Sequence, residues 1–337
     1  MQKRIKHSTD MSQSPSRLFA LDYTRAFAII LVVAGHWNPE PRPEWWHIAF
    51  NIIYSFHMPL FLAISGYLYM HTRKPGNYLK MLRGKFKRLL VPYFFTSLII
   101  ITIKLFTQGN AHVEHPVTIS TYLKALYYPS AGYYLWFMWA LWWMFAIIPL
   151  FKTKSSRIVL FIICLVLNAM PWFAPQTFCI AQALNMMVFF VTGTLLYDWK
   201  EWLLPTNDTK IIALLSIIFI GLETGYILGV EIFKLFAAFI SIQLFPMLFK
   251  HLESTISQRW HKWLMTISST SFIIYLFHTT FLGFVKSTVH PLLALNNEWT
   301  YGLLIIAATT IGTALPILLA VKILNKFRLT RWMFALK

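Results

Sequence analysis

Residues 21–37 read LDYTRAFAIILVVAGHW. This stretch is apolar enough to cross a membrane, yet it carries Asp22, Arg25 and His36. An unpaired Arg in the middle of a spanning helix costs about 2.5–3.5 kcal/mol on insertion scales, and such residues face the interior of a helix bundle. The stretch therefore predicts a membrane domain with an internal polar site, used for chemistry or for transport.

The composition of the whole chain is that of a membrane protein. Of its 337 residues, 57% are hydrophobic and 12% are charged, whereas soluble domains carry about 25% charged residues. Apolar runs of about 20 residues predict one span each, so we expect an all-α, polytopic membrane protein with about ten transmembrane helices. The runs are centred near Ile29, Phe61, Leu98, Trp142, Ile163, Val188, Ile217, Ala238, Tyr275 and Thr310.

The basic residues are distributed unevenly between the loops. Most of the 30 Lys and Arg fall in the two tails and the even-numbered loops, while the odd-numbered loops carry only Arg42, Lys124 and Lys286. The positive-inside rule then predicts cytoplasmic N and C termini. We expect a cytoplasmic tail over residues 1–19, a transmembrane domain over 20–325 and a cytoplasmic tail over 326–337. The net charge of +18 thus reflects topology, and no nucleic-acid partner is expected.

Helix geometry places the polar residues of the first span on one face. Residues 11 positions apart are rotated by about 20° from three full turns and lie about 16 Å apart along the axis, as Arg25 and His36 do. Asp22 precedes Arg25 by three positions, which favours an ion pair. His36 is a candidate general base, since imidazole takes and returns a proton near neutral pH. The alternative is a helix-end His in the headgroup zone.

The second span, IIYSFHMPLFLAISGYLYM over residues 52–70, carries His57, Pro59, Ser65 and Gly66. The Pro predicts a kink, and the Ser-Gly pair allows close backbone approach, so this span is expected to pack tightly against the first and to open a polar cavity. A packing kink without a ligand is the alternative. His57, and His278 in the ninth span, either line this cavity or are packed, hydrogen-bonded residues.

Two further segments are candidates for binding. RGKFKRLLVPY, over residues 83–93, places Arg83, Lys85 and Arg88 at the cytoplasmic mouth, where such a cluster binds phosphates or only anionic lipid. YYLWFMWALWWMF, over residues 133–145, fits an aromatic belt at the outer end of the fourth span. Its rings, with Trp136 among them, are alternatively cavity-lining and stack on a sugar.

LDYTRAFAIILVVAGH, FHMPLFLAISGYLY and KFKRLLVPYF, in that order and spacing, resemble the bacterial type-3 membrane acyltransferase family in its stand-alone branch. YLWFMWALWWMF and SSTSFIIYLFH are weaker similarities. The Arg-x10-His pair of the family falls on Arg25 and His36. Its Phe-Phe-x-x-Ser-Gly motif falls on 61–66, with Leu replacing the second Phe, and its Arg-x-x-Arg motif falls on Lys85 and Arg88, with Lys replacing the first Arg.

The resemblance implies a ten-span enzyme of the bacterial cytoplasmic (inner) membrane that O-acylates, most often O-acetylates, cell-surface glycans. It implies acetyl-CoA or another acyl-CoA as cytoplasmic donor substrate, with no permanently bound cofactor and no metal. The acceptor would be a glycan or lipid-linked saccharide, and the other partners membrane lipids and the glycan biosynthesis machinery. Taken together with the helix geometry, the candidate site residues are catalytic His36, Arg25 and Asp22; donor-binding Lys85, Arg88, Arg83 and Ser65; and His57, His278 and Trp136 as candidates for lining the cavity.

The main alternative is a multi-span transporter or flippase for a glycan or lipid-linked precursor. Ten spans with an interior Arg and His also suit a substrate path. A structural subunit of a glycan synthase complex would leave the charges of the first span unexplained. Release or transfer of the acyl group of acetyl-CoA by the purified protein separates an enzyme from a transporter.

Overall fold

Helices make up all the regular secondary structure in the part of the chain that the computed structural model describes, residues 18–74, 76–109, 115–170, 174–199, 208–293 and 297–336. This confirms the all-α prediction. The long helices are α1 (Phe19–Gly35), α2 (Glu44–Thr72), α3 (Tyr78–Thr107), α5 (Trp136–Ile147), α6 (Lys154–Ala169), α7 (Ile180–Asp198), α9 (Thr209–Ile227), α10 (Ile232–Leu252), α11 (Gln258–Leu293) and α12 (Glu298–Leu319). The short α4 (Ser120–Lys124) and α13 (Arg328–Met333) complete the set.

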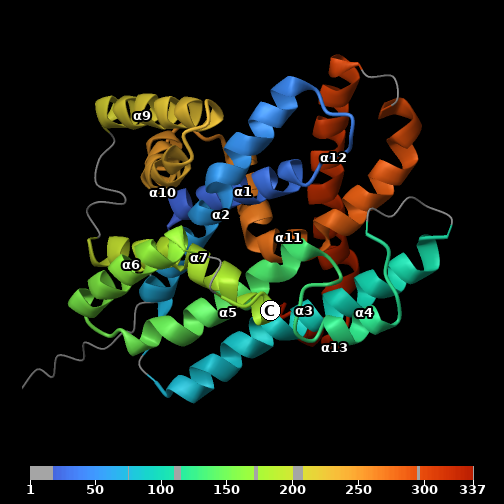
Figure 1. Cartoon of the computed structure of the whole chain (residues 1–337), viewed down its shortest axis with the longest axis horizontal. Helices are drawn as coiled ribbons and strands as arrows, with labels where there is room; N and C mark the ends of the chain where they lie inside the picture. Colours follow the sequence, from blue (N-terminus) through green and yellow to red (C-terminus); the bar gives the residue numbers. More distant parts are fainter. Residues whose placement is uncertain are drawn as a thin grey trace, which may run out of the picture.

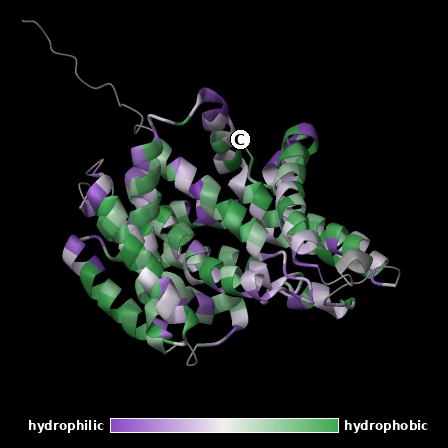
Figure 2. Cartoon of the chain, turned by 90° about the horizontal axis from the view of Figure 1, so that it is seen from above, coloured by the Kyte–Doolittle hydropathy of each residue, from purple (hydrophilic) through white to green (hydrophobic). Residues whose placement is uncertain are grey.

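Each predicted span coincides with one of the ten long helices. Eight segments of the described chain are long and apolar enough to cross a membrane, and the other two predicted spans are α1 and α6, of 17 and 16 residues. Hydrophobic residues run along nearly all of the helices (Figure 2). Residues 1–17 of the predicted N-terminal tail lie outside the described residues, and the cytoplasmic placement of both termini stays a prediction.

The first helix lies inside the bundle. It contacts α2, α10, α11 and α12, whereas α9 lies at the periphery, against α10 and the edge of α2 (Figure 1). The exposed side chains of α9 are large and apolar, among them Leu214, Ile217 and Ile220, at 57%, 69% and 64% exposure. A central first helix is what its charged residues require, because lipid cannot solvate them.

The segment after α1 is folded into the bundle. α1 ends at Gly35, and Pro39, Pro41 and Pro43 follow at alternate positions, which prevents a helix from continuing. The Trp46 indole donates to the carbonyl of residue 37 at 3.0 Å, and the Tyr301 hydroxyl donates to that of Pro39 at 3.0 Å. These bonds tie the connection to α2 and α12, so the face around the end of α1 is covered.

A pair of glycines brings α2 and α7 into backbone contact. A Cβ on Gly66 would overlap the carbonyl oxygen of Phe190, and one on Gly193 would overlap that of Ala63. Small residues at both positions therefore permit the crossing, as in other membrane bundles. The Ser-Gly pair was expected to let this span pack tightly against the first. α2 does contact α1, but the closest backbone approach at Gly66 is to α7.

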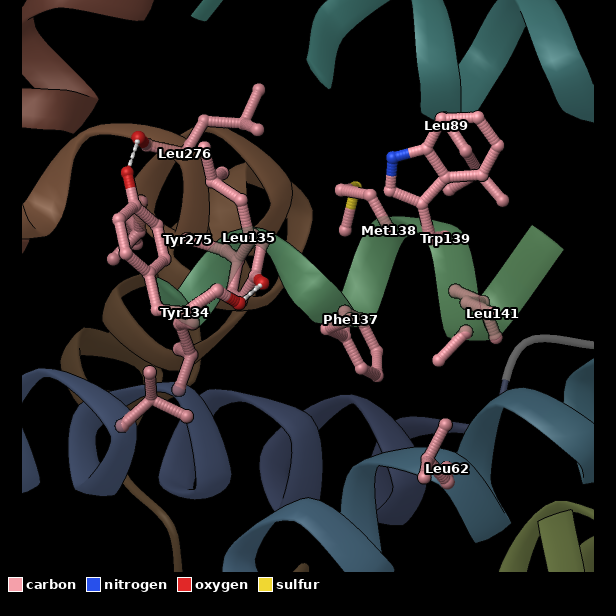
Figure 3. Close-up of a cluster of buried hydrophobic side chains, with 14 of the residues drawn as sticks. Leu62, Leu89, Tyr134, Leu135, Phe137, Met138, Trp139, Leu141, Tyr275 and Leu276 are labelled. Atoms are coloured by element: carbon pink, nitrogen blue, oxygen red, sulfur yellow. Dashed lines mark hydrogen bonds between the residues drawn. The ribbon is translucent and has the colours of Figure 1, made fainter. Parts of the chain in front are cut away.

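The aromatic segment of α5 is mostly internal. Tyr134 and Trp139 are only 8% and 6% exposed, and Figure 3 shows the α5 side chains packed with Leu62 of α2, Leu89 of α3 and Leu276 of α11. The prediction of an interfacial belt is wrong for these two rings, because α5 packs against α3 and α7, and its Phe137 ring lies against Tyr275 of α11.

Candidate active site

The predicted polar residues of the first span meet α11 at successive levels. Tyr23 Oη lies 2.6 Å from Nδ1 of His261, Arg25 contacts Ser268, and His36 contacts His278. Residue numbers rise together on the two helices, so α1 and α11 run in the same direction. This agrees with their expected crossing as the first and ninth spans.

Arg25 belongs to a polar network that joins α1 to α11. Its Nη2 donates to Asp22 Oδ1 at 2.8 Å and to Ser268 Oγ at 2.7 Å, and its Nε donates to the same hydroxyl at 3.0 Å. The Ser268 hydroxyl in turn donates to Asp22 Oδ1 at 2.7 Å. The ion pair predicted from the three-residue spacing is thus confirmed. The Arg25 side chain is 27% exposed, which leaves part of it accessible to a substrate.

His36 lies in a group of aromatic and imidazole rings. Its ring centroid is 4.8 Å from that of His278, 5.7 Å from that of Tyr134 and 6.4 Å from that of Tyr54. His57 lies against the other side of Tyr54, at 4.9 Å. The three histidines predicted from separate spans are therefore brought into one cluster, which we call the histidine cluster: His36, Tyr54, His57, Tyr134 and His278.

The histidine cluster lies within the lengths of two long helices. His57 is near the middle of the 29-residue α2, and His278 is well inside the 36-residue α11. Both are buried, at 3% and 0% exposure, while His36 is half-buried. His36 therefore packs against residues that lie inside the lengths of its neighbouring helices, and its depth relative to the lipid headgroups stays a prediction.

Two tyrosines connect the start of the α5 region to α11 by hydrogen bonds beside this cluster. The Tyr134 hydroxyl donates to the carbonyl of Leu276 at 2.7 Å, and the Tyr275 hydroxyl donates to the carbonyl of Tyr134; both bonds are visible in Figure 3. The bonds fix the start of the α5 region against the turn of α11 that carries His278. Both hydroxyl protons are thereby used by the backbone.

The basic residues of α3 form a separate cluster. Lys85 is turned inward, with its Nζ 3.6 Å from the ring centroid of Phe145 on α5 and 5.6 Å from that of Tyr69 on α2. Arg83 and Arg88 are exposed. A Lys over aromatic faces is held by cation–π attraction, so Lys85 presents its charge from a fixed position, while the two arginines extend from the protein surface.

The remaining predicted site residues have ordinary local contacts. The Ser65 hydroxyl donates to the carbonyl of Phe61 in its own helix at 2.9 Å. Nδ1 of His57 bonds to the carbonyl of Ile53 at 2.5 Å. Trp136 lies half-buried against Phe137, edge to face. It is Tyr134, two positions earlier, that contacts the histidines.

Sequence reasoning missed Ser268, Tyr54 and Tyr134. Ser268 precedes His278 by ten positions, nearly the spacing of Arg25 and His36. Two helices packed in parallel with matching spacings place their polar residues at the same two levels, so this repeated interval was the available signal. No comparable signal marks the tyrosines, whose neighbours are equally aromatic.

The site offers imidazole nitrogens, a guanidinium and hydroxyls. Within the described ranges, no group of three or more His, Cys, Asp and Glu is placed to hold a metal ion. A half-buried imidazole beside a second imidazole is suited to moving a proton, and an Arg network about 16 Å below it on the same helix is suited to holding a polar or anionic substrate group.

Fold and site thus define an all-α membrane protein with a polar site built between its first and ninth predicted spans. The sequence profile described as an acyltransferase domain matches residues 18–321. The chain belongs to this family, the type-3 membrane acyltransferases.

Among curated relatives, the chain is similar to nodulation protein NolL of Sinorhizobium fredii, with 31% identity over 46% of this chain and 43% of the relative. It is also similar to nodulation protein NolL of Mesorhizobium japonicum, with 28% identity over 60% of this chain and 54% of the relative. The matches thus span about half the length of each relative. No solved structure matches the chain significantly.

Proposed function

We propose that the protein is an O-acyltransferase of the bacterial inner membrane, with both termini in the cytoplasm, which moves an acyl group, most simply acetyl, from cytoplasmic acyl-CoA to a hydroxyl of a cell-surface glycan or lipid-linked saccharide. One observation carries the proposal in a chain of this family. A single internal helix holds the Arg25 network toward one end and His36 at the other, each paired with a polar residue of α11.

The donor would enter from the side of α3. Arg83 and Arg88 are exposed there, and Lys85 is fixed beside them over the ring of Phe145. Guanidinium and ammonium groups are the side chains that bind phosphates, so these residues would hold the nucleotide phosphates of CoA. Ser65, half-buried on α2, would line the path of the donor.

The pantetheine arm would pass the Arg25 network and reach His36. The separation of about 16 Å along α1 is comparable to the length of an extended pantetheine arm. Asp22 and Ser268 hold the guanidinium in one orientation, so Arg25 would position the arm. The thioester would then lie beside the histidine cluster.

At His36, transfer is a substitution at the acyl carbon. The imidazole takes the proton of the acceptor hydroxyl, the hydroxyl oxygen forms the new bond to the thioester carbon, and the carbon–sulfur bond breaks. The proton then passes from His36 to the departing CoA thiolate, which leaves as the free thiol. Atoms and charges balance, and no metal or redox partner is needed. A covalent acyl-His36 intermediate is the rival route.

Deletion and complementation test the proposal. Surface glycans from a strain lacking the gene are compared by mass spectrometry with those from strains complemented by the wild type, His36→Ala, or the control His47→Ala, whose imidazole is exposed on α2. Wild type and control should restore one acetyl mass per modified sugar, and His36→Ala should not, at equal membrane levels. Full acetylation with His36→Ala would reject His36 as the catalytic residue.

Purified protein separates the enzyme from the transporter. An enzyme should release CoA from acetyl-CoA in the presence of glycan isolated from the deletion strain, whereas a transporter should not. Arg88→Ala should raise the KM for acetyl-CoA, while Lys87→Ala, an exposed cation of the same helix, serves as the control. Equal KM values for the two variants would remove Arg88 from the donor site.

A further inference from the structure

His278 has one ring nitrogen that its surroundings leave unused. Its Nδ1 lies 2.8 Å from the carbonyl oxygen of Tyr275 and 3.1 Å from that of Ile274. A carbonyl oxygen only accepts hydrogen bonds, so Nδ1 carries the hydrogen and the neutral ring presents a bare lone pair at Nε2. That Nε2 is buried and has no hydrogen-bond partner in the described structure.

The surrounding groups cannot satisfy this nitrogen. Two of the nearest rings are those of Tyr134 and Tyr275, at centroid distances of 5.1 and 6.1 Å. Both hydroxyls already donate to backbone carbonyls. The other neighbour is His36, at 4.8 Å with its plane tilted by 57°. Buried polar atoms are rarely left without a partner, and those that are often serve a functional step.

A packing role for His278 does not account for the geometry. The hydrogen bonds of Nδ1 to its own helix satisfy one nitrogen only, and a leucine would fill the same space without burying a second polar atom. When His36 acts as a base at one nitrogen, its other nitrogen carries an N–H in the neutral ring as well as in the imidazolium. Protonation makes that N–H a stronger, charge-assisted donor, so an acceptor inside the bundle stabilises the protonated ring most.

We propose that His278 is a positioning residue for His36. When His36 takes the proton of the acceptor hydroxyl, its second N–H donates to Nε2 of His278, which stays neutral throughout. The proton returns from His36 to the CoA thiolate as the carbon–sulfur bond breaks. This role rests on the proposed function. It corresponds to the orienting group that holds a catalytic imidazole in other transferases and hydrolases, with a neutral imidazole in place of a carboxylate.

Two substitutions of His278 test the roles of its two ring nitrogens one at a time. In His278→Asn, the amide nitrogen can replace Nδ1 in its bonds to the helix carbonyls, but nothing reaches the position of Nε2. In His278→Gln, the amide oxygen can reach the position of Nε2 and accept a hydrogen bond. The two variants are therefore matched in polarity and differ in the atom that the proposal concerns.

The assay measures CoA release from acetyl-CoA by purified protein with glycan from the deletion strain, normalised to monodisperse protein. His278→Asn should lower kcat by about 10–100-fold, the usual effect of removing an orienting partner, with an unchanged KM for acetyl-CoA. His278→Gln should recover most of the lost kcat. A purely structural role would instead lower the amount of monodisperse protein and leave its kcat intact.

Three results would overturn the proposal. If His278→Asn has the kcat of the wild type, Nε2 of His278 plays no part in the transfer. If both variants lose kcat equally, or if KM for acetyl-CoA rises instead, an acceptor at Nε2 is not what matters. In these cases an active wild type leaves the proposed function standing. A wild type that transfers no acetyl group at all overturns the proposed function, and this role with it.

Discussion

The Ser268 hydroxyl bridges both charged residues of the first span, and its removal tests the network directly. In Ser268→Ala, Arg25 loses the acceptor that it contacts at 2.7 and 3.0 Å, and Asp22 loses the donor at 2.7 Å. The ion pair at 2.8 Å remains. The substitution leaves no cavity, so any effect comes from lost hydrogen bonds.

The size of the expected loss of stability follows from the charges of Arg25 and Asp22. Hydrogen bonds to charged groups contribute about 1.5–3 kcal/mol each. The side chains of Arg25 and Asp22 are 27% and 12% exposed, so water replaces part of what is lost, and we expect a net destabilisation of about 1.5–3 kcal/mol. With an unfolding entropy of about 2.1 cal/mol/K per residue, a loss of this size lowers the Tm of a 337-residue chain by about 2–4 °C. A mispositioned Arg25 should also slow transfer, about tenfold for each 1.4 kcal/mol of lost transition-state stabilisation.

Thermal unfolding of the purified protein in detergent measures the first effect, and CoA release at 25 °C measures the second. Ser269→Ala is the matched control, since Ser269 is the exposed neighbour on α11 and bonds only within its helix. A Tm and rate equal to those of the wild type for Ser268→Ala would refute the reasoning. An equal loss in Ser269→Ala would show that any serine in this turn matters.

Three further predictions concern contacts between helices. Gly66→Ala should cost about 1–3 kcal/mol because its Cβ overlaps a backbone carbonyl of α7, while Gly221→Ala, with open space around it, should not; thermal unfolding compares them. Lys85→Met should lose about 0.5–2 kcal/mol of cation–π attraction. Lys87→Met, at an exposed position of the same helix, should lose no stability in the same measurement. Glu223→Leu should lower stability by about 0.6–1.7 kcal/mol, as its carboxyl bonds to a hydroxyl of α2. Glu223→Gln should retain the wild-type Tm, and a loss equal to that of the Leu variant would contradict the bond.

The helices could be predicted from the sequence, but not their neighbours. Hydrophobicity is local, so each span was found where it lies. It does not distinguish a helix in the core from one facing lipid, because lipid is as apolar as the core. Thr209–Ile227 and Thr177–Asp198 each contain a stretch of spanning length that is nearly equally apolar, yet 11% of the residues are buried in the first stretch and 61% in the second. This is why the sequence could predict that α2 packs against α1 but not that Gly66 contacts α7.

The site, like the fold, could be predicted where it depends on residues close in the sequence, but not where it depends on which helices are neighbours. Asp22 and Arg25 are three positions apart, so their ion pair could be predicted from helix geometry. Ser268 is separated from Arg25 by 243 positions, and only the similar spacing of the polar residues on the two helices relates them. His278 was predicted to line a cavity, but its distance from His36 depends on the register of two helices. The sequence supplied the residues of the site, and packing decided which of them meet.

That register is held by a third helix. A Cβ on Gly312 of α12 would lie 2.7 Å from a methyl of Val33 and 3.1 Å from one of Leu282. At Gly312, α12 therefore packs against both α1 and α11, one turn beyond His278 on α11. A slip of α11 by a single turn, about 5.4 Å, would separate both Arg25 from Ser268 and His36 from His278. The contact at Gly312 opposes this slip, because a glycine allows both helices to approach α12 closely. The contact at Gly312 therefore helps to hold both levels of the site, Arg25 with Ser268 and His36 with His278, in one register.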